Sequence, residues 1–180
     1  VKWRVSQSCS VDEGALASDG TIYVTCVGST GSMIYAYDPT GAEKWHADIG
    51  PVTDAISFAP LIDDAGNIYG SNPTSVVSFS PSGTVNWRLT GLIQNFVHPA
   101  VDVNRNVYII AKLASNAPWT LLAVKDGVVA SNYGAIDATY AGALLLAPDG
   151  KLYYNANGTL TSLQTAGASP AAGSVIAISR

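Results

Sequence analysis

A tryptophan that recurs at intervals of 42 residues constrains the fold of this chain more than any other feature of its sequence. The three copies are Trp3, Trp45 and Trp87, in a chain of 180 residues. Self-similarity at a period of about 20 to 50 residues is typical of solenoids, propellers and other repeat architectures. We therefore expect one supersecondary unit that is repeated along the whole chain.

Two further markers accompany the tryptophans and describe the unit. One is a turn pair and an apolar residue before a tyrosine, at Tyr23, Tyr69, Tyr108 and Tyr153. The other is a short apolar run, at residues 34–37, 76–79, 121–124 and 175–178. Such runs between Gly- and Asn-rich turns are typical of short antiparallel strands, and no stretch shows the 3.6-residue period of a helix.

These markers predict an all-β fold, a β-propeller built from four-stranded antiparallel blades. Each blade contains an inner strand, the tyrosine strand, the apolar strand and the tryptophan strand. We expect a single domain over residues 1–180, with blades at about 7–49, 50–92, 93–134 and 135–180. In the fourth blade the third strand is predicted at 175–178, after a long insertion from 155 to 173.

The two ends of the chain complement each other. Residues 1–6 carry only a tryptophan strand, the last strand of a blade, and residues 175–180 end on a third strand. If these segments pair, the N-terminal strand closes a ring of four blades and removes exposed sheet edges. The alternative is that the chain is half of an eight-bladed ring formed by a homodimer.

At these residues the chain resembles the quinoprotein-type propeller repeat, which occurs in pyrroloquinoline-quinone (PQQ) alcohol dehydrogenases and in related PQQ-like propellers. The tryptophan-docking motif of that family is complete at Ala36, Asp38, Gly41 and Trp45, and a second copy keeps Gly83 and Trp87. The resemblance implies that the three repeated tryptophans are structural and stack between neighbouring blades. It leaves function open, because this repeat serves dehydrogenases, scaffolds and sensors alike.

Composition argues against several classes of partner. A net charge of −4 with no basic patch argues against nucleic acid. No apolar run approaches the ~18 residues of a membrane helix, so no membrane span is expected. Cys9 and Cys26 form either a disulfide or two buried thiols. The low charge, the option of a disulfide and the lack of an initiating Met favour an extracytoplasmic, periplasmic or secreted protein.

The sequence shows no constellation of catalytic or metal-binding residues. The two histidines, His46 and His98, fall in different strand types of different blades, without spaced partners, so no metal site is predicted. Acidic pairs such as Asp63–Asp64 and Asp12–Glu13 are explained by turns, in which an Asp side chain bonds the nearby backbone. We expect neither a cofactor nor enzymatic activity.

Surface recognition remains, on the loop-rich face where a rigid ring displays its side chains. The candidate contacts on this face are Trp119, Asp54, Asn95, Phe96, Asp137 and Tyr140. Trp119 lies outside the 42-residue spacing and is either an exposed anchor or a residue that covers the third blade.

These observations predict a non-catalytic scaffold or binding module that recognises a protein or a glycan on its loop-rich face. The alternative is a fragment or subunit of a larger quinoprotein-like or lyase-like propeller enzyme, whose further blades carry the site. A third hypothesis is a repeat unit of an extracellular assembly, with the low-charge surface as the interface.

Overall fold

The computed structural model describes residues 2–51, 57–94, 98–136 and 141–165, and all regular secondary structure in these ranges is β-strand. The strands form four antiparallel sheets that follow one another along the chain. The predicted all-β fold with antiparallel four-stranded units is therefore confirmed, with differences at the N-terminus and in the fourth sheet.

The first sheet contains β1 (Ser10–Leu16), β2 (Ile22–Val27), β3 (Ser32–Tyr37) and β4 (Glu43–Gly50). The second contains β5 (Leu61–Ile62), β6 (Ile68–Asn72), β7 (Ser75–Phe79) and β8 (Val85–Thr90). The third contains β10 (Ala100–Val101), β11 (Val107–Lys112), β12 (Thr120–Lys125) and β13 (Val128–Ala135), and β9 (Ile93–Gln94) pairs with the end of β11. The fourth contains β14 (Ala141–Leu146), β15 (Lys151–Ala156) and β16 (Thr159–Gln164).

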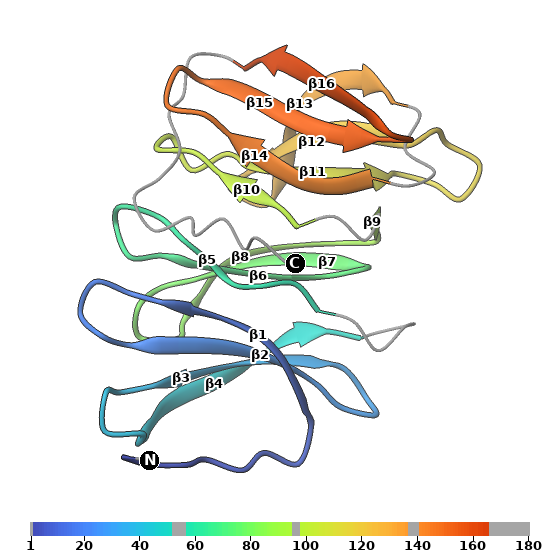
Figure 1. Cartoon of the computed structure of the whole chain (residues 1–180). Coiled ribbons are helices and arrows are strands. Elements are labelled where there is room, and N and C mark those ends of the chain that lie inside the picture. The colour runs from blue at the N-terminus through green and yellow to red at the C-terminus, as the bar shows by residue number, and fades with distance from the viewer. Residues whose placement is uncertain (1, 52–56, 95–97, 137–140, 166–180) are drawn as a thin grey trace.

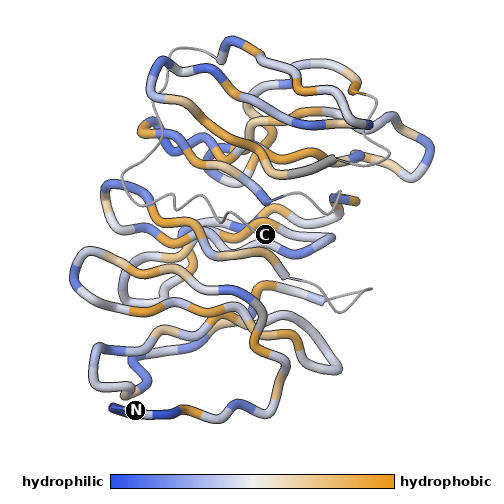
Figure 2. Tube along the Cα trace, viewed as in Figure 1, coloured by the Kyte–Doolittle hydropathy of each residue, from blue (hydrophilic) through white to orange (hydrophobic). Residues whose placement is uncertain are grey.

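The four sheets are stacked face to face, and the hydrophobic core lies between them (Figure 1). One cluster of buried side chains, which includes Phe79, joins the first and second sheets. Two more join the second to the third, around Ile109, and the third to the fourth, around Leu152. Figure 2 shows hydrophobic residues along the strands and hydrophilic residues in the turns at their ends.

The position of each sheet in the stack explains its sequence pattern. The second and third sheets have a neighbour on both faces. Every residue of β6 and β7 is buried, and so is every residue of β11 and β12 except the last. A strand that is buried on both faces reads as a continuous run of apolar and small residues. The corresponding strands of the first sheet, β2 and β3, instead alternate between buried and partly buried residues over part of their length.

Two tryptophans join the first sheet to the segments that precede and follow it in the chain. Trp45 in β4 donates its Nε1 hydrogen to the carbonyl oxygen of Pro81 in the next sheet, at 2.9 Å. Its ring lies over Gly83, where a Cβ atom would stand only 2.7 Å from the indole. Glycine is therefore required at this position both by the contact and by its positive φ of 86°.

The other two tryptophans also pack on a glycine of a neighbouring turn, Trp3 as closely as Trp45 and Trp87 less closely. Trp3 donates Nε1 to the carbonyl oxygen of Pro39 at 3.0 Å and lies over Gly41 as Trp45 lies over Gly83. Trp87 lies less tightly against the third sheet, since a Cβ at Gly127 would be 3.2 Å from the Trp87 Cβ. Packing between successive sheets accounts for the 42-residue spacing.

The N-terminal segment reaches the first sheet without forming a strand. Residues 2–7 have no strand assignment, whereas the sequence predicts a closing strand over 1–6. The segment is held instead by the contacts of Trp3 and by a hydrogen bond from the Gln7 amide to the Tyr37 hydroxyl. Its predicted partner, 175–180, lies outside the described residues, so closure of a four-bladed ring stays a prediction.

A disulfide also anchors this segment. The structure joins Cys9, just before β1, to the fully buried Cys26 in β2, with a Cα–Cα distance of 5.7 Å. Of the two states that the sequence left open for these cysteines, the structure contains the disulfide.

The third strand of the fourth sheet differs from the prediction. It is β16, which lies inside the stretch 155–173 interpreted as an insertion and pairs with β15 from Lys151↔Gln164 to Ala156↔Thr159. Asn157 and Gly158 both have positive φ, 50° and 77°, as a tight two-residue hairpin turn requires. The turn therefore brings β16 directly back onto β15, and the predicted strand at 175–178 lies outside the described residues.

The turn between the first two strands of each sheet has the same backbone in all four sheets. It is closed by hydrogen bonds of 2.9 to 3.0 Å to the carbonyl oxygens of residues 17, 63, 102 and 147, donated by Gly20, Gly66, Arg105 and Gly150. In the second and third sheets the accepting residue is a buried aspartate, Asp63 or Asp102. In the first and fourth it is Ala17 or Ala147.

The two buried aspartates make matching sets of hydrogen bonds. Asp102 accepts from the backbone nitrogens of Asn104 and Asn106, from the Asn106 side chain and, at 3.0 Å, from the Tyr108 hydroxyl. Asp63 makes the equivalent set, including one at 2.8 Å from the Tyr69 hydroxyl. The repeated tyrosine thus satisfies a buried carboxylate in the two middle sheets.

Candidate functional site

A glutamate and a histidine from different sheets meet where the first strands of the sheets converge. Glu13 lies in β1 at a register shift between Val11 and Gly14, an irregularity that commonly redirects a side chain. Its Oε2 accepts a hydrogen bond of 2.9 Å from the backbone nitrogen of Ala59 and lies 3.2 Å from Nδ1 of His98. We call Glu13, Ala59 and His98 the axial cluster.

The axial cluster draws on all four sheets. Glu13 belongs to the first sheet, Ala59 precedes β5 in the second, and His98 precedes β10 in the third. The His98 carbonyl accepts a hydrogen bond of 3.3 Å from the nitrogen of Leu144 in β14. Phe58, which is almost fully buried, meets the imidazole edge to face with ring centroids 5.9 Å apart. The four first strands therefore position one acid–imidazole pair.

The pair is reachable from solvent. The side chains of Glu13 and His98 are 36% and 39% exposed. A carboxylate at Nδ1 holds a proton there and leaves Nε2 to donate or accept a hydrogen bond. The arrangement can thus bind a polar ligand, and it has the parts of a general base with an orienting carboxylate.

Sequence reasoning missed this pair, because it found no spaced partner for either histidine. The structure gives each a glutamate: His46 Nδ1 also lies 2.7 Å from Oε1 of Glu43, on the exposed strand β4. The interpretation of Glu13 as a turn residue is wrong, since it lies in β1. The sequence offered one partial signal, because Ala59-Pro60 and His98-Pro99 stand at equivalent positions of the repeat and so lie at the same end of neighbouring sheets. The contact of Glu13 with both residues is seen in the structure alone.

The predicted contact residues are only partly placed. Asp54, Asn95, Phe96, Asp137 and Tyr140 lie outside the described residues. Trp119 is half-buried against the core between the third and fourth sheets, with Lys112 Nζ 4.8 Å from its ring centroid. Trp119, before β12, and His98, before β10, both lie at the end of the third sheet that was predicted to be the loop-rich face.

Neither a metal cluster nor a membrane helix occurs in the described ranges. No group of three or more His, Cys, Asp or Glu side chains there is arranged to hold a metal ion. The same residues contain no helix long and apolar enough to cross a membrane.

Comparison with known proteins identifies the fold class. No protein-family model matches the sequence, and no curated protein is significantly similar to it. Among solved structures, the chain is similar to a catalytically inactive virginiamycin B lyase from Staphylococcus aureus with quinupristin. The identity is 14% and the TM-score 0.62, over 91% of this chain and 58% of the lyase.

Two further structures give the same result. A streptogramin B lyase matches at 16% identity and a TM-score of 0.59, over 90% of this chain and 57% of its own. Regucalcin, a calcium-binding protein from Agrobacterium tumefaciens, matches at 13% and 0.56, over 91% and 63%. The chain has the fold of a β-propeller and spans less than two thirds of the length of these proteins. Membership of the quinoprotein-type repeat family stays a prediction.

Proposed function

We propose that this chain is a propeller binding module that recognises a protein or a glycan on its loop-rich face, with the axial cluster as the polar anchor. The observation that carries the proposal is the half-exposed pair of Glu13 and His98, held in place by the backbone of Ala59. The bond from Ala59 fixes the carboxylate, and the carboxylate orients the imidazole, so both side chains present their remaining polar atoms in a defined geometry.

The chemistry of the cluster fits a ligand rich in hydroxyl or amide groups. Glu13 Oε1 can accept and His98 Nε2 can donate or accept, so the pair can bridge two neighbouring polar groups. The Glu13 carboxylate is anchored by the backbone of Ala59, and the His98 ring contacts that carboxylate and Phe58, which lowers the entropy lost when a ligand is bound. Trp119 adds a partly exposed aromatic surface on the same end of the third sheet.

The test compares two histidine–glutamate pairs in one chain. Wild type, Glu13→Gln and His98→Asn are applied to an oligosaccharide array and a peptide array. Glu43→Gln and His46→Asn, which alter the outer pair on β4, are the matched controls. We expect the axial variants to lose about tenfold in binding, since each removes a charge-assisted hydrogen bond, and the controls to match wild type.

Two results contradict the proposal. One is the absence of wild-type binding on both arrays. The other is an equal loss from the axial and outer variants, which would attribute the effect to charge alone. Near-ultraviolet circular dichroism of each variant separates loss of binding from loss of fold.

A second candidate is that the chain belongs to a larger lyase-like propeller enzyme, with His98 as the base and Glu13 as the group that orients it. The axial geometry favours this candidate, and two of the similar structures are lyases of streptogramin-type compounds by name. Incubation with quinupristin, followed by chromatography and mass spectrometry, tests it. Its consumption by wild type and by His46→Asn, but not by His98→Asn, supports the enzyme, and unchanged quinupristin argues against it.

The disulfide supports an extracytoplasmic location, because such bonds persist in oxidising compartments. Native mass spectrometry of the purified chain tests the assembly. A species near 18.6 kDa supports a ring that closes within one chain, whereas twice that mass supports the eight-bladed homodimer.

A further inference from the structure

The docking site of Trp87 lacks the hydrogen-bond acceptor that the other two repeated tryptophans have. Trp3 and Trp45 each donate Nε1 to the carbonyl oxygen of a turn proline. The two acceptors are Pro39 and Pro81. Trp87 Nε1 donates to no residue in the described ranges, and this nitrogen is not buried. One of three equivalent sites therefore presents an accessible donor that the described part of the chain does not use.

The acceptor is missing because the neighbouring turn is shorter. Residues 38–42 join β3 to β4 and residues 80–84 join β7 to β8, and each of these turns contains the accepting proline. Only Asp126 and Gly127 join β12 to β13. Both have positive φ, 50° and 80°, as a tight two-residue hairpin turn requires. The third sheet thus offers Trp87 a carboxylate-bearing turn without a proline.

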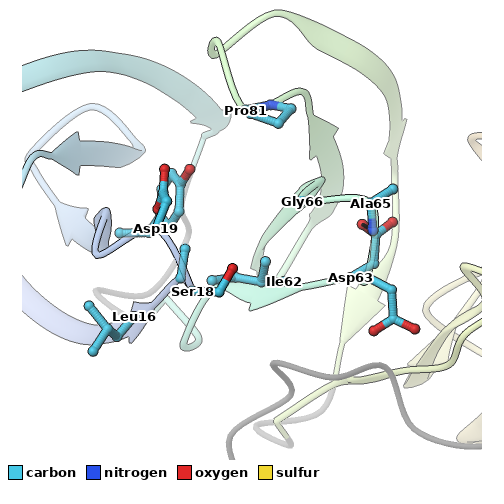
Figure 3. Close-up of a pocket in the computed structure, with 11 residues that line it drawn as sticks. Leu16, Ser18, Asp19, Ile62, Asp63, Ala65, Gly66 and Pro81 are labelled. Carbon is cyan, nitrogen blue, oxygen red and sulfur yellow. Dashed lines mark hydrogen bonds between the residues drawn. The ribbon is translucent and has the colours of Figure 1, made fainter.

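The same sheet has an arginine where the first two sheets have glycine. At Gly66 a Cβ atom would stand 3.4 Å from Cγ of Pro81, and both residues border the space between the first and second sheets in Figure 3. At Gly20 a Cβ atom would stand 2.9 Å from Cγ of Pro39. Since the third sheet lacks this proline, the closing position of its turn accommodates a side chain, that of Arg105.

A pocket of about 150 Å³ lies at this place, between the second and third sheets. Asn67, Asn86 and Trp87 line it from the second sheet, and Arg105 and Asp126 line it from the third. Asn86 Nδ2 donates to Asn67 Oδ1 at 3.2 Å, so these two amides already bond each other. The groups left for a guest are the indole N–H, the guanidinium and the carboxylate.

The two charged groups of the pocket have no ionic partner. Neither Arg105 nor Asp126 forms a salt bridge with the other or with any other described residue. Burial raises the pKa of Tyr69, which also lines the pocket, and the positive charge of Arg105 opposes that rise. In the fourth sheet, by contrast, Asp149 and Lys151 pair at 2.8 Å. Opposite charges that line one small pocket without meeting are complementary to a guest that carries both signs.

We propose that this pocket binds a zwitterionic α-amino acid. The carboxylate of the guest accepts hydrogen bonds from the Trp87 indole and the Arg105 guanidinium, in place of the prolyl carbonyl of the other two sites, and its ammonium group donates to Asp126. Arg105 follows β10, whereas His98 precedes it, so the pocket and the axial cluster lie at opposite ends of the strands. The function proposed above therefore stands or falls separately.

The test titrates L-alanine into the nitrogen-15-labelled full chain and follows the Nε1 signal of Trp87, which the variant Trp87→Phe assigns. N-acetyl-L-alanine keeps the carboxylate and lacks the ammonium group, and L-alaninamide keeps the ammonium group and lacks the carboxylate. We expect L-alanine to move the signal and to bind at least about tenfold more tightly than either relative, since each has lost one charge-assisted contact. An unmoved signal, or equal affinity for either relative, would overturn the proposal.

The dipeptide L-alanyl-L-alanine distinguishes a free amino acid from the ends of a peptide, because its two charges stand farther apart. Weaker binding of the dipeptide than of L-alanine supports the proposal. Equal or tighter binding overturns the assignment to a free amino acid and assigns the pocket to a short peptide.

Two substitutions test the charged groups, and both suit a positive φ. Arg105→Gly restores the residue type of the first two sheets, and asparagine before glycine is favoured in tight turns, which suits Asp126→Asn. We expect each to weaken binding of L-alanine about tenfold, and Asp126→Asn to abolish the preference over N-acetyl-L-alanine. Lys151→Gln and Asp149→Asn, which alter the paired charges of the fourth sheet, are the controls. Wild-type affinity in both pocket variants, or an equal loss in the controls, contradicts the proposal.

Discussion

The turns of the two middle sheets and those of the two end sheets share one backbone and handle their carboxylates in opposite ways. Asp102 is fully buried and accepts four hydrogen bonds, whereas the Asp149 side chain is 53% exposed and accepts hydrogen bonds from the backbone nitrogen and the side chain of its neighbour Lys151. A middle sheet is covered on both faces, so its turn must satisfy a buried charge completely. The end sheets have alanine at that position, Ala17 or Ala147, and carry their aspartate two residues later in the turn, where it is exposed. The turns therefore share a backbone and differ in where the carboxylate stands, and only the middle sheets place it in the interior.

The largest expected difference comes from removing the aspartates. Asp102→Ala leaves a buried tyrosine hydroxyl and two backbone nitrogens without their acceptor, and we expect a loss of about 3 kcal/mol in the free energy of unfolding. Urea denaturation measures it. Asp149→Ala, which removes the exposed aspartate two residues further along the equivalent turn of the fourth sheet, is the control and should shift the urea midpoint far less. Similar shifts for the two variants would remove the distinction between middle and end sheets.

The second difference appears in alkali. Burial, reinforced by the nearby Asp63 or Asp102, raises the pKa values of Tyr69 and Tyr108 above the usual value of about 10. The folded state therefore holds these phenolic protons more tightly than the unfolded state. We expect the free energy of unfolding to be unaffected by these groups below pH of about 10 and to fall as the pH rises above it.

Denaturant unfolding at a series of alkaline pH values, with absorbance at 295 nm to follow phenolate formation, measures this effect. In the variant Tyr69→Phe combined with Tyr108→Phe, the alkaline loss should become shallower. A loss of the same steepness in that variant would assign it to other groups.

A smaller difference is expected from single hydroxyl groups. Tyr69→Phe removes a donor to the buried Asp63 and should cost about 1 kcal/mol. Tyr23→Phe should lower the free energy of unfolding by less. The first sheet has Ala17 where the second sheet has Asp63, so this substitution deprives no buried carboxylate of a hydrogen-bond donor. Thermal unfolding measures which variant is less stable. If Tyr23→Phe were the less stable one, the hydrogen bond between Tyr69 and Asp63 would not contribute to stability.

The smallest effect belongs to the exposed aspartates of the end sheets. A backbone hydrogen bond from Thr21 lowers the pKa of Asp19, and the side chain of Lys151 lowers that of Asp149. Their stabilisation is present above the ordinary value of about 4 and is lost as the pH falls below it. Because both carboxylates are solvated, Asp19→Asn with Asp149→Asn should flatten the acid limb of the stability profile only slightly; a steepened limb would contradict this assignment.

The sequence predicts the repeat, the strands and the turn position of Asp63, because these follow from local periodicity and turn chemistry. It does not predict that Asp63 is buried and bonded to Tyr69, since that depends on the sheets on either side. The Glu13–His98 contact joins residues that only the curvature of the stack brings together. The sequence does not predict β16, because this strand is largely polar and the run at 175–178 is more apolar. The Asn157–Gly158 turn nevertheless directs the chain straight back onto β15.

The disulfide before β1 has a mechanical consequence. A pulling force applied to the N-terminus first strips the contacts of Trp3 and then arrives at Cys9. From there the load passes through the sulfur bridge into Cys26, in the interior of the first sheet, and bypasses the edge strand β1. We therefore expect the ladder between β1 and β2 to resist unzipping from this end while the bridge is intact, and we expect reduction to let a force on the N-terminus peel β1 from β2.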